Sequence, residues 1–123
     1  MKVLVADDEP GLRSFISAVL QEQGHEVITS NDSQRTVQML SDGPPDLLIL
    51  DLMMPGWTGH EVVHHIDHEL GLKDLPLILM KPVGHRHWLP DGHGPADVLP
   101  KPFDVDGLVQ TVNRMPQPNS PGA

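Results

Sequence analysis

The chain has 123 residues, no cysteine and a formal net charge of −9 at neutral pH. Its length suits one domain with a single core. The absence of cysteine excludes disulfides and thiol chemistry, and the acidic balance argues against direct nucleic-acid binding, which needs a basic surface. The sequence shows neither a signal peptide nor a membrane-spanning run, so we expect a cytoplasmic protein without membrane insertion.

Short apolar runs recur along the chain and predict buried strands. They lie at 2–6, 26–30, 46–50, 75–80 and 97–100. Four of them show little alternation of apolar and polar residues, which is typical of parallel strands covered on both faces. The run at 26–30 is more mixed, so we expect it nearer an edge of the sheet.

Helical patterns separate most of these strands. Apolar residues recur at helical spacing within 11–24, 33–40, 59–70 and 104–115. Gly24 is a stop signal for the first helix, and Asp104 is a candidate N-cap for the last. Alternating strands and helices indicate an α/β fold with a parallel sheet and right-handed crossovers.

The stretch 81–96 breaks this alternation. It holds three prolines and three glycines in sixteen residues, which disfavour a regular helix. We expect an irregular loop there, or at most one turn at 85–89, where a fourth helix would stand. Residues 1–115 are therefore predicted to form one domain, followed by a disordered, Pro-rich tail at 116–123.

Charged residues follow the predicted strands at the carboxyl ends, where open parallel sheets bind ligands. Asp7 and Asp8 follow the first strand, Asp51 the third, Lys81 the fourth and Lys101 the fifth. Carboxylates gathered at one edge repel each other, and a hard divalent cation such as Mg²⁺ removes that repulsion. Because neighbouring lysines bind phosphoryl oxygens, this pattern predicts Asp51 as a nucleophile in phosphoryl transfer.

The motifs that carry these residues are similar to those of response regulator receiver domains. The matching stretches are LVADDEP, the GHEV after the first helix, PDLLILDLMMPGWTG and KPF, and the resemblance runs from Lys2 to about Met115. It implies a flavodoxin-like fold, a doubly wound five-stranded parallel sheet in the order 2-1-3-4-5 flanked by helices. It also implies a signalling domain rather than an enzyme, with a histidine kinase or phosphotransfer protein as the phosphoryl donor.

The resemblance assigns a role to each matching residue. Asp51 is the implied phosphoacceptor, and Lys101 is the implied contact to the phosphoryl group. Mg²⁺ is expected to be bound directly by Asp8, through water by Asp7, and by Asp51 and the backbone carbonyl of Met53.

Two positions depart from the family pattern. Lys81, thirty residues after Asp51, stands where the family has Thr or Ser, and Val98 stands where it has Tyr or Phe. Lys81 is expected either to pair with Asp51 before phosphorylation or to replace the hydroxyl as a donor to the phosphoryl group. In both cases the conformational change that transmits the signal should differ from that of the family.

Histidines and tryptophans raise the question of further sites. Imidazole suits zinc, copper or nickel, but we interpret the histidines as solvated side chains on the predicted 59–70 helix and in the loop: His60, His64, His65, His68, His85, His87 and His93. Trp57 and Trp88 are candidates for exposed partner contacts, although Trp57 is expected to pack over the loop after Asp51.

Three functions fit the sequence. The first is a stand-alone receiver, phosphorylated on Asp51 in a Mg²⁺-dependent reaction, that signals by binding an unidentified downstream protein. The second is a degenerate receiver acting as a phosphorylation-independent interaction module, which Lys81, Val98 and the missing helix favour. The third, a metal-dependent phosphohydrolase, is disfavoured because the sequence offers no second acid–base residue near Asp51.

Overall fold

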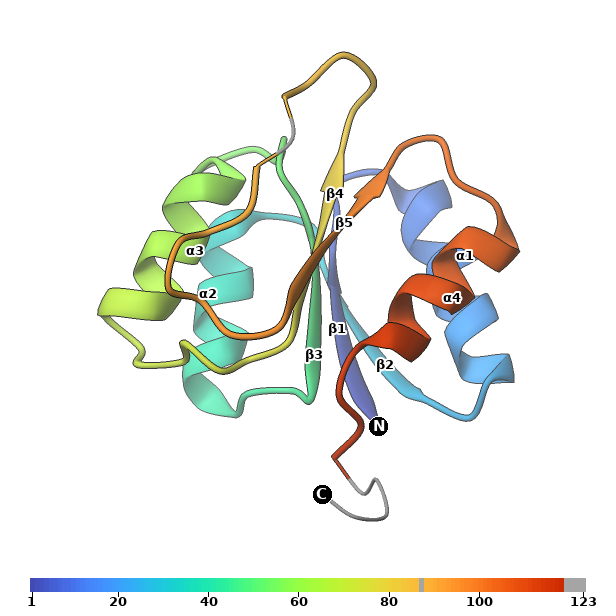
Figure 1. Ribbon diagram of the computed structural model, residues 1–123, viewed down its shortest axis with the longest axis horizontal. Helices are drawn as coiled ribbons and strands as arrows, with labels where there is room; N and C mark the ends of the chain where they lie inside the picture. Colours follow the sequence, from blue (N-terminus) through green and yellow to red (C-terminus); the bar gives the residue numbers. More distant parts are fainter. Residues whose placement is uncertain (87, 119–123) are drawn as a thin grey trace.

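A computed structural model describes residues 1–86 and 88–118 (Figure 1). Its centre is a parallel five-stranded sheet in the order β2-β1-β3-β4-β5. The strands are β1 (Lys2–Ala6), β2 (Glu26–Ser30), β3 (Leu47–Asp51), β4 (Leu77–Lys81) and β5 (Ala96–Pro100). This arrangement confirms the predicted doubly wound, flavodoxin-like fold and its strand order.

Four helices cover the two faces of the sheet among the described residues. Helices α1 (Pro10–Glu22) and α4 (Val105–Arg114) lie on one face, and α2 (Ser33–Asp42) and α3 (Gly59–His68) lie on the other (Figure 1). The predicted N-cap of the last helix is confirmed, because the Asp104 side chain accepts a hydrogen bond from the Gly107 N–H at 2.7 Å.

Each central strand contributes to two hydrophobic cores, one on each face of the sheet. In β3, Leu48 and Leu50 belong to the core that α2 and α3 cover, whereas Leu47 and Ile49 belong to the core beneath α1 and α4. Both kinds of position are buried, which explains why the sequence run does not alternate. Strand β2 is an edge strand, as its mixed composition predicted.

Element boundaries differ from the predicted ones by one or two residues. Strand β3 begins one residue later and includes Asp51, while β4 begins at Leu77 because the preceding Pro76 has no N–H to donate. Helix α3 ends at His68, and Gly71, with a φ of 67°, turns the chain toward β4.

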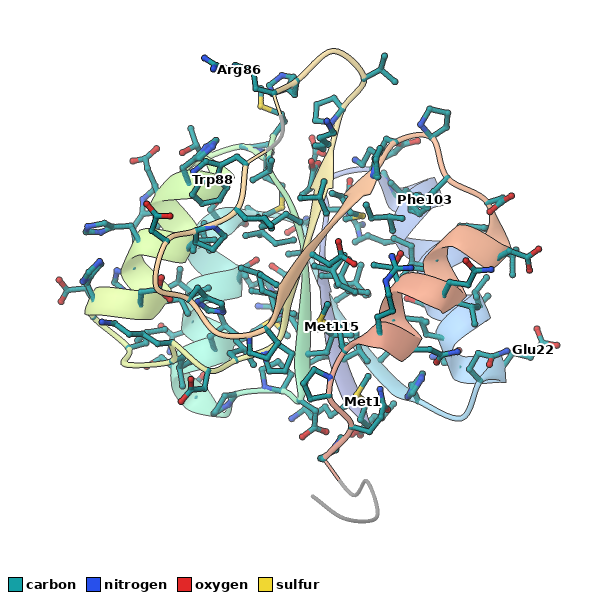
Figure 2. All side chains as sticks on the ribbon, in the orientation of Figure 1. Met1, Glu22, Arg86, Trp88, Phe103 and Met115 are labelled. Carbon is teal, nitrogen blue, oxygen red and sulfur yellow. The ribbon has the colours of Figure 1, made fainter. Side chains whose placement is uncertain are left out.

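The connection between β4 and β5 is a loop, as expected, with no helix at 82–86 or 88–95. Trp88 is half-buried against the core on the α3 side, so it is not the exposed contact residue that we expected (Figure 2). His87 and residues 119–123, which include most of the predicted disordered tail, lie outside the described residues. In the part of the chain that is described, no helix is both long and apolar enough to cross a membrane.

Gly59 begins α3 in close contact with the residue after Asp51. A Cβ atom at Gly59 would lie 2.6 Å from Leu52 Cδ2 and 2.7 Å from Leu52 Cα. Because one of these atoms is backbone, the contact cannot be relieved by a side-chain rotation. Gly59→Ala is therefore expected to lower the free energy of unfolding by about 1–3 kcal/mol in urea denaturation.

Gly11 in α1 provides the matched control for this substitution. A Cβ atom there would meet nothing within 4 Å. Gly11→Ala should therefore leave stability unchanged or raise it by up to about 1 kcal/mol, because alanine is the better helix former. Equal unfolding midpoints for Gly59→Ala and the native chain would show that α3 does not need this close approach.

Candidate phosphoacceptor and metal site

Three carboxylates and one ammonium meet at the carboxyl edge of the sheet. Asp7 and Asp8 follow β1, Asp51 is the last residue of β3, and Lys101 follows β5. One oxygen from each carboxylate lies within 4.8 Å of the other two. The sheet thus gathers residues that are far apart in the sequence, at the edge that the sequence indicated.

Lys101 links the two buried carboxylates of this group. Its Nζ lies 2.8 Å from Asp7 Oδ2, to which it donates a hydrogen bond, and 3.4 Å from Asp51 Oδ2. Asp7 is fully buried and Asp51 is only 3% exposed. Buried carboxylates are costly without a partner, so this shared ammonium offsets part of the cost of placing two of them side by side.

The surroundings of Asp51 disfavour its ionised form. Burial raises the pKa of Asp51, and the charge of Asp7 raises it further, whereas the Met53 N–H and Lys101 act in the opposite direction. Burial alone would lower the pKa of Lys101, but its hydrogen bond to Asp7 and the charge of Asp51 outweigh burial and raise it. One ammonium therefore does not neutralise the site.

The donor set suits a hard divalent cation. Asp7, Asp8 and Asp51 offer carboxylate oxygens, the ligands that Mg²⁺ prefers, and Asp8 is exposed, so waters can complete the coordination. No other group of three or more candidate ligands appears among the residues that the structure describes. An added dication would supply the positive charge that Lys101 alone does not.

The loop after Asp51 is held in place from two sides. The Met53 N–H donates to Asp51 Oδ1 at 3.0 Å, and Ser33 Oγ at the start of α2 donates to the Trp57 carbonyl at 2.7 Å. Trp57 is half-buried and packs against α3, with its ring centroid 5.1 Å from that of His65. Sequence analysis missed Ser33, whose position at the start of a helix carries no signal for this role.

Lys81 lies at the end of β4, but it does not contact Asp51. Its ammonium donates to the backbone carbonyl of His85 at 3.1 Å, and Lys81 has no ion pair among the described residues. The expected pairing of Lys81 with Asp51 is therefore not formed in this state. Val98, in place of the family's aromatic residue, is buried in β5.

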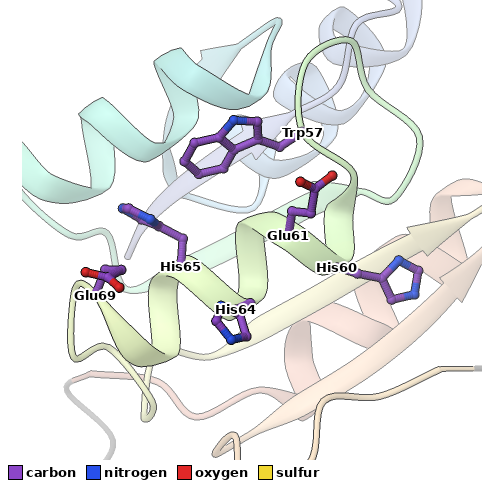
Figure 3. A pocket seen from close by; sticks show the side chains of 6 residues that line it. All are labelled: Trp57, His60, Glu61, His64, His65 and Glu69. Atoms are coloured by element: carbon purple, nitrogen blue, oxygen red, sulfur yellow. The ribbon is translucent and has the colours of Figure 1, made fainter.

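Three histidines of α3 help to line a shallow hollow (Figure 3). Its volume is about 450 Å³, and its lining comprises Trp57, His60, Glu61, His64, His65 and Glu69. His60, His64 and His68 are exposed, in agreement with their interpretation as a solvated face, whereas His65 is half-buried against Trp57 and differs from that interpretation. His93 differs from that interpretation, because its side chain is fully buried against Asp67 of α3.

The raised pKa of Asp51 gives a prediction for stability. Its ionised form is disfavoured in the folded state, so folded chains lose stability as the pH rises through the Asp51 pKa. Without Mg²⁺ at neutral pH, Asp51→Asn should raise the free energy of unfolding by about 1 kcal/mol, measured by thermal unfolding. The gain should shrink at acid pH, where Asp51 becomes protonated.

Asp42, an exposed residue at the end of α2, is the control for this measurement. Asp42→Asn should change stability by no more than about 0.5 kcal/mol. A lower stability of Asp51→Asn than of the native chain would mean that the contact with Lys101 outweighs the burial of the charge.

Comparison with known proteins agrees with this geometry. The response regulator receiver domain family matches residues 3–113. Response regulator RR06 of Streptococcus pneumoniae is 40% identical over 118 residues, which cover 94% of this chain and 52% of the relative. Phosphate regulon transcriptional regulatory protein PhoB of Escherichia coli is 29% identical over 124 residues, covering 99% and 54%. The chain thus spans about half the length of these two relatives.

A solved structure shares the fold over most of both chains. The chemotaxis response regulator CheY4 of Vibrio cholerae superimposes with a TM-score of 0.80 at 28% identity, covering 92% of this chain and 96% of that one. Family match, sequence relatives and fold agree, and the chain belongs to the response regulator receiver domain family.

Proposed function

We propose that this receiver domain accepts a phosphoryl group on Asp51 from the phosphohistidine of a histidine kinase or phosphotransfer protein. The observation that carries the proposal is the buried Asp51 carboxylate, with Asp7, Asp8 and Lys101 around it at one edge of the sheet. The phosphorylated domain would then signal by contact with a downstream protein. Its acidic balance disfavours direct contact with nucleic acid.

The proposed reaction transfers one group and consumes no other reactant. An Asp51 oxygen forms a bond to phosphorus as the bond from phosphorus to the donor histidine nitrogen breaks, and that nitrogen leaves with the bonding pair. Lys101 would bind a phosphoryl oxygen, and Met53 N–H holds the other Asp51 oxygen in place. Mg²⁺, held by Asp7, Asp8, Asp51 and the Met53 carbonyl, would neutralise charge on the transferred group.

The product of this reaction is the modified chain itself, so the domain is a signalling element rather than a turnover enzyme. Attack of water on phosphorus would later return Asp51 and inorganic phosphate, which resets the domain. The same residues that assist the forward transfer would assist this step.

Lys81 would act as a second cation for the phosphoryl group. It ends the strand beside β3, and its present acceptor is a single loop carbonyl, that of His85. A phosphoryl group on Asp51 would offer charged oxygens, which are stronger acceptors than a neutral carbonyl. Transfer of the Lys81 ammonium from the His85 carbonyl to the phosphoryl group would disturb the loop. The usual family rearrangement involves an aromatic ring at the position of Val98, and Val98 has no such ring.

The first test is intact-protein mass spectrometry after incubation with Mg²⁺ and a small phosphodonor. The native chain and Asp42→Asn should gain one phosphoryl group, whereas Asp51→Asn, or any chain treated with a chelator, should gain none. Asp42→Asn is the matched control because it removes an exposed carboxylate far from the site.

A failure to gain the group, followed by failure with a phosphorylated kinase domain, would support the competing function. That function is a phosphorylation-independent interaction module, which the lysine at position 81 and the valine at position 98 favour. Turnover of a simple phosphomonoester would instead point to a phosphohydrolase.

The role of Lys81 is tested by the rate and lifetime of phosphorylation. Lys81→Met should slow phosphorylation by about 10- to 100-fold, because a charge-assisted hydrogen bond contributes about 1.5–3 kcal/mol. Lys73→Met, which removes an exposed lysine elsewhere, should leave the rate unchanged. If Lys81→Met and Lys81→Thr both keep the native rate and the native lifetime, Lys81 has no part in the reaction.

A further inference from the structure

A buried histidine attaches the β4–β5 loop to α3. This histidine, His93, lies near the β5 end of the loop, whereas Lys81 precedes the loop at the end of β4. His93 Nδ1 lies 2.6 Å from Asp67 Oδ1, and His93 Nε2 lies 2.6 Å from the backbone carbonyl oxygen of Leu75. The His93 side chain is 0% exposed and that of Asp67 is 9% exposed. Asp67 belongs to α3, and Leu75 lies in the connection from α3 to β4.

The two contacts of His93 fix the number of protons that the pair must hold. A backbone carbonyl only accepts hydrogen bonds, so Nε2 must carry a proton. If Asp67 is ionised it also only accepts, so Nδ1 must carry a second proton. If Nδ1 instead accepts, the proton lies on the Asp67 carboxyl. In both arrangements the pair holds one proton more than a neutral imidazole beside a carboxylate.

Loss of that proton leaves a buried lone pair facing an oxygen atom. With one ring proton left, either Nδ1 faces the Asp67 carboxylate or Nε2 faces the Leu75 carbonyl without a hydrogen between them. An unsatisfied polar contact of this kind is costly in a site that excludes water. Breaking the contact and exposing the ring to water removes this cost, so proton loss favours release of the loop.

Other charged groups lie near the pair but do not replace its proton. Lys73 and Asp74 border Gly94, the residue after His93, and Asp91 and His85 lie in the loop itself. The exposed His64 and His68 flank Asp67 along α3. In the described structure none of these side chains forms a hydrogen bond or ion pair with Asp67 or His93.

We propose that Asp67 and His93 form a proton-dependent latch, which attaches residues 88–95 of the β4–β5 loop to α3 while the pair holds its additional proton and releases them as the pH rises. The latch uses neither Asp51 nor a phosphoryl group, so it is a second input to the domain, independent of the proposed function.

The latch is tested by ¹⁵N NMR of the native chain between about pH 6 and about pH 9. Nitrogen shifts of the His93 ring report its ring protons, and backbone amides of the loop report its attachment. At the lower pH the pair should show the additional proton. As the pH rises, loop amides should shift with the same midpoint as His93, and the ratio of attached to released loop should fall about tenfold per pH unit.

Asp67→Asn separates proton dependence from simple contact. An asparagine N–H can donate to His93 Nδ1 while Nε2–H donates to Leu75, so a neutral ring satisfies both contacts. This variant should keep the loop attached at high pH and abolish the transition. His93→Gln should also abolish it, whereas the control His85→Gln, in the same loop, should retain it.

Two results would overturn the latch. One is a native His93 that carries a single ring proton at about pH 6, beside an ionised Asp67, with the loop still attached. The other is a set of loop amides that do not respond when His93 loses its proton. Amides of β1 serve as the internal reference in every variant, because they report whether the sheet remains folded.

Discussion

The ammonium of Lys101 lies between two buried carboxylates, and the rest of the molecule keeps it there. Lys101 follows the fifth strand of the sheet, while Asp7 and Asp51 belong to the first and third in chain order. Only a parallel arrangement brings these three carboxyl ends to the same edge. Burial is the main cause of the raised pKa of Asp51, and the charge of Asp7 adds to it. Two carboxylates sharing one ammonium also keep a net negative charge, which supports the dication binding that we propose.

Much of this could be predicted from the sequence, because the features concerned depend on local pattern. Strands buried on both faces appear as continuous apolar runs, and charged residues directly after them mark the ligand-binding edge. Asp7, Asp8, Asp51 and Lys101 were placed correctly by this argument alone. Element ends were less certain, since a proline or a glycine shifts a boundary by a residue or two.

The features that were missed depend on contacts between distant residues in an irregular loop. His93 and Asp67 are 26 residues apart, and no periodic pattern links them. A loop rich in proline and glycine indicates only that a helix is absent, so its histidines were interpreted as solvated. Lys81 lies at the end of the fourth strand, as the sequence predicted, but its contact with the loop was missed for the same reason, because its acceptor is a backbone carbonyl, which any residue at position 85 would supply.

The division of β3 between two cores has a consequence for how the acceptor is positioned. Alternate residues of β3 face opposite sides of the sheet, and Asp51 pairs in register with Met80 of β4. A shift of β3 by one residue would exchange the side chains of the two cores and carry Asp51 away from Asp7 and Lys101. Hydrophobic packing thus fixes the strand register that positions the acceptor. An insertion or deletion within this strand cannot change the position of the acceptor without also disrupting both cores.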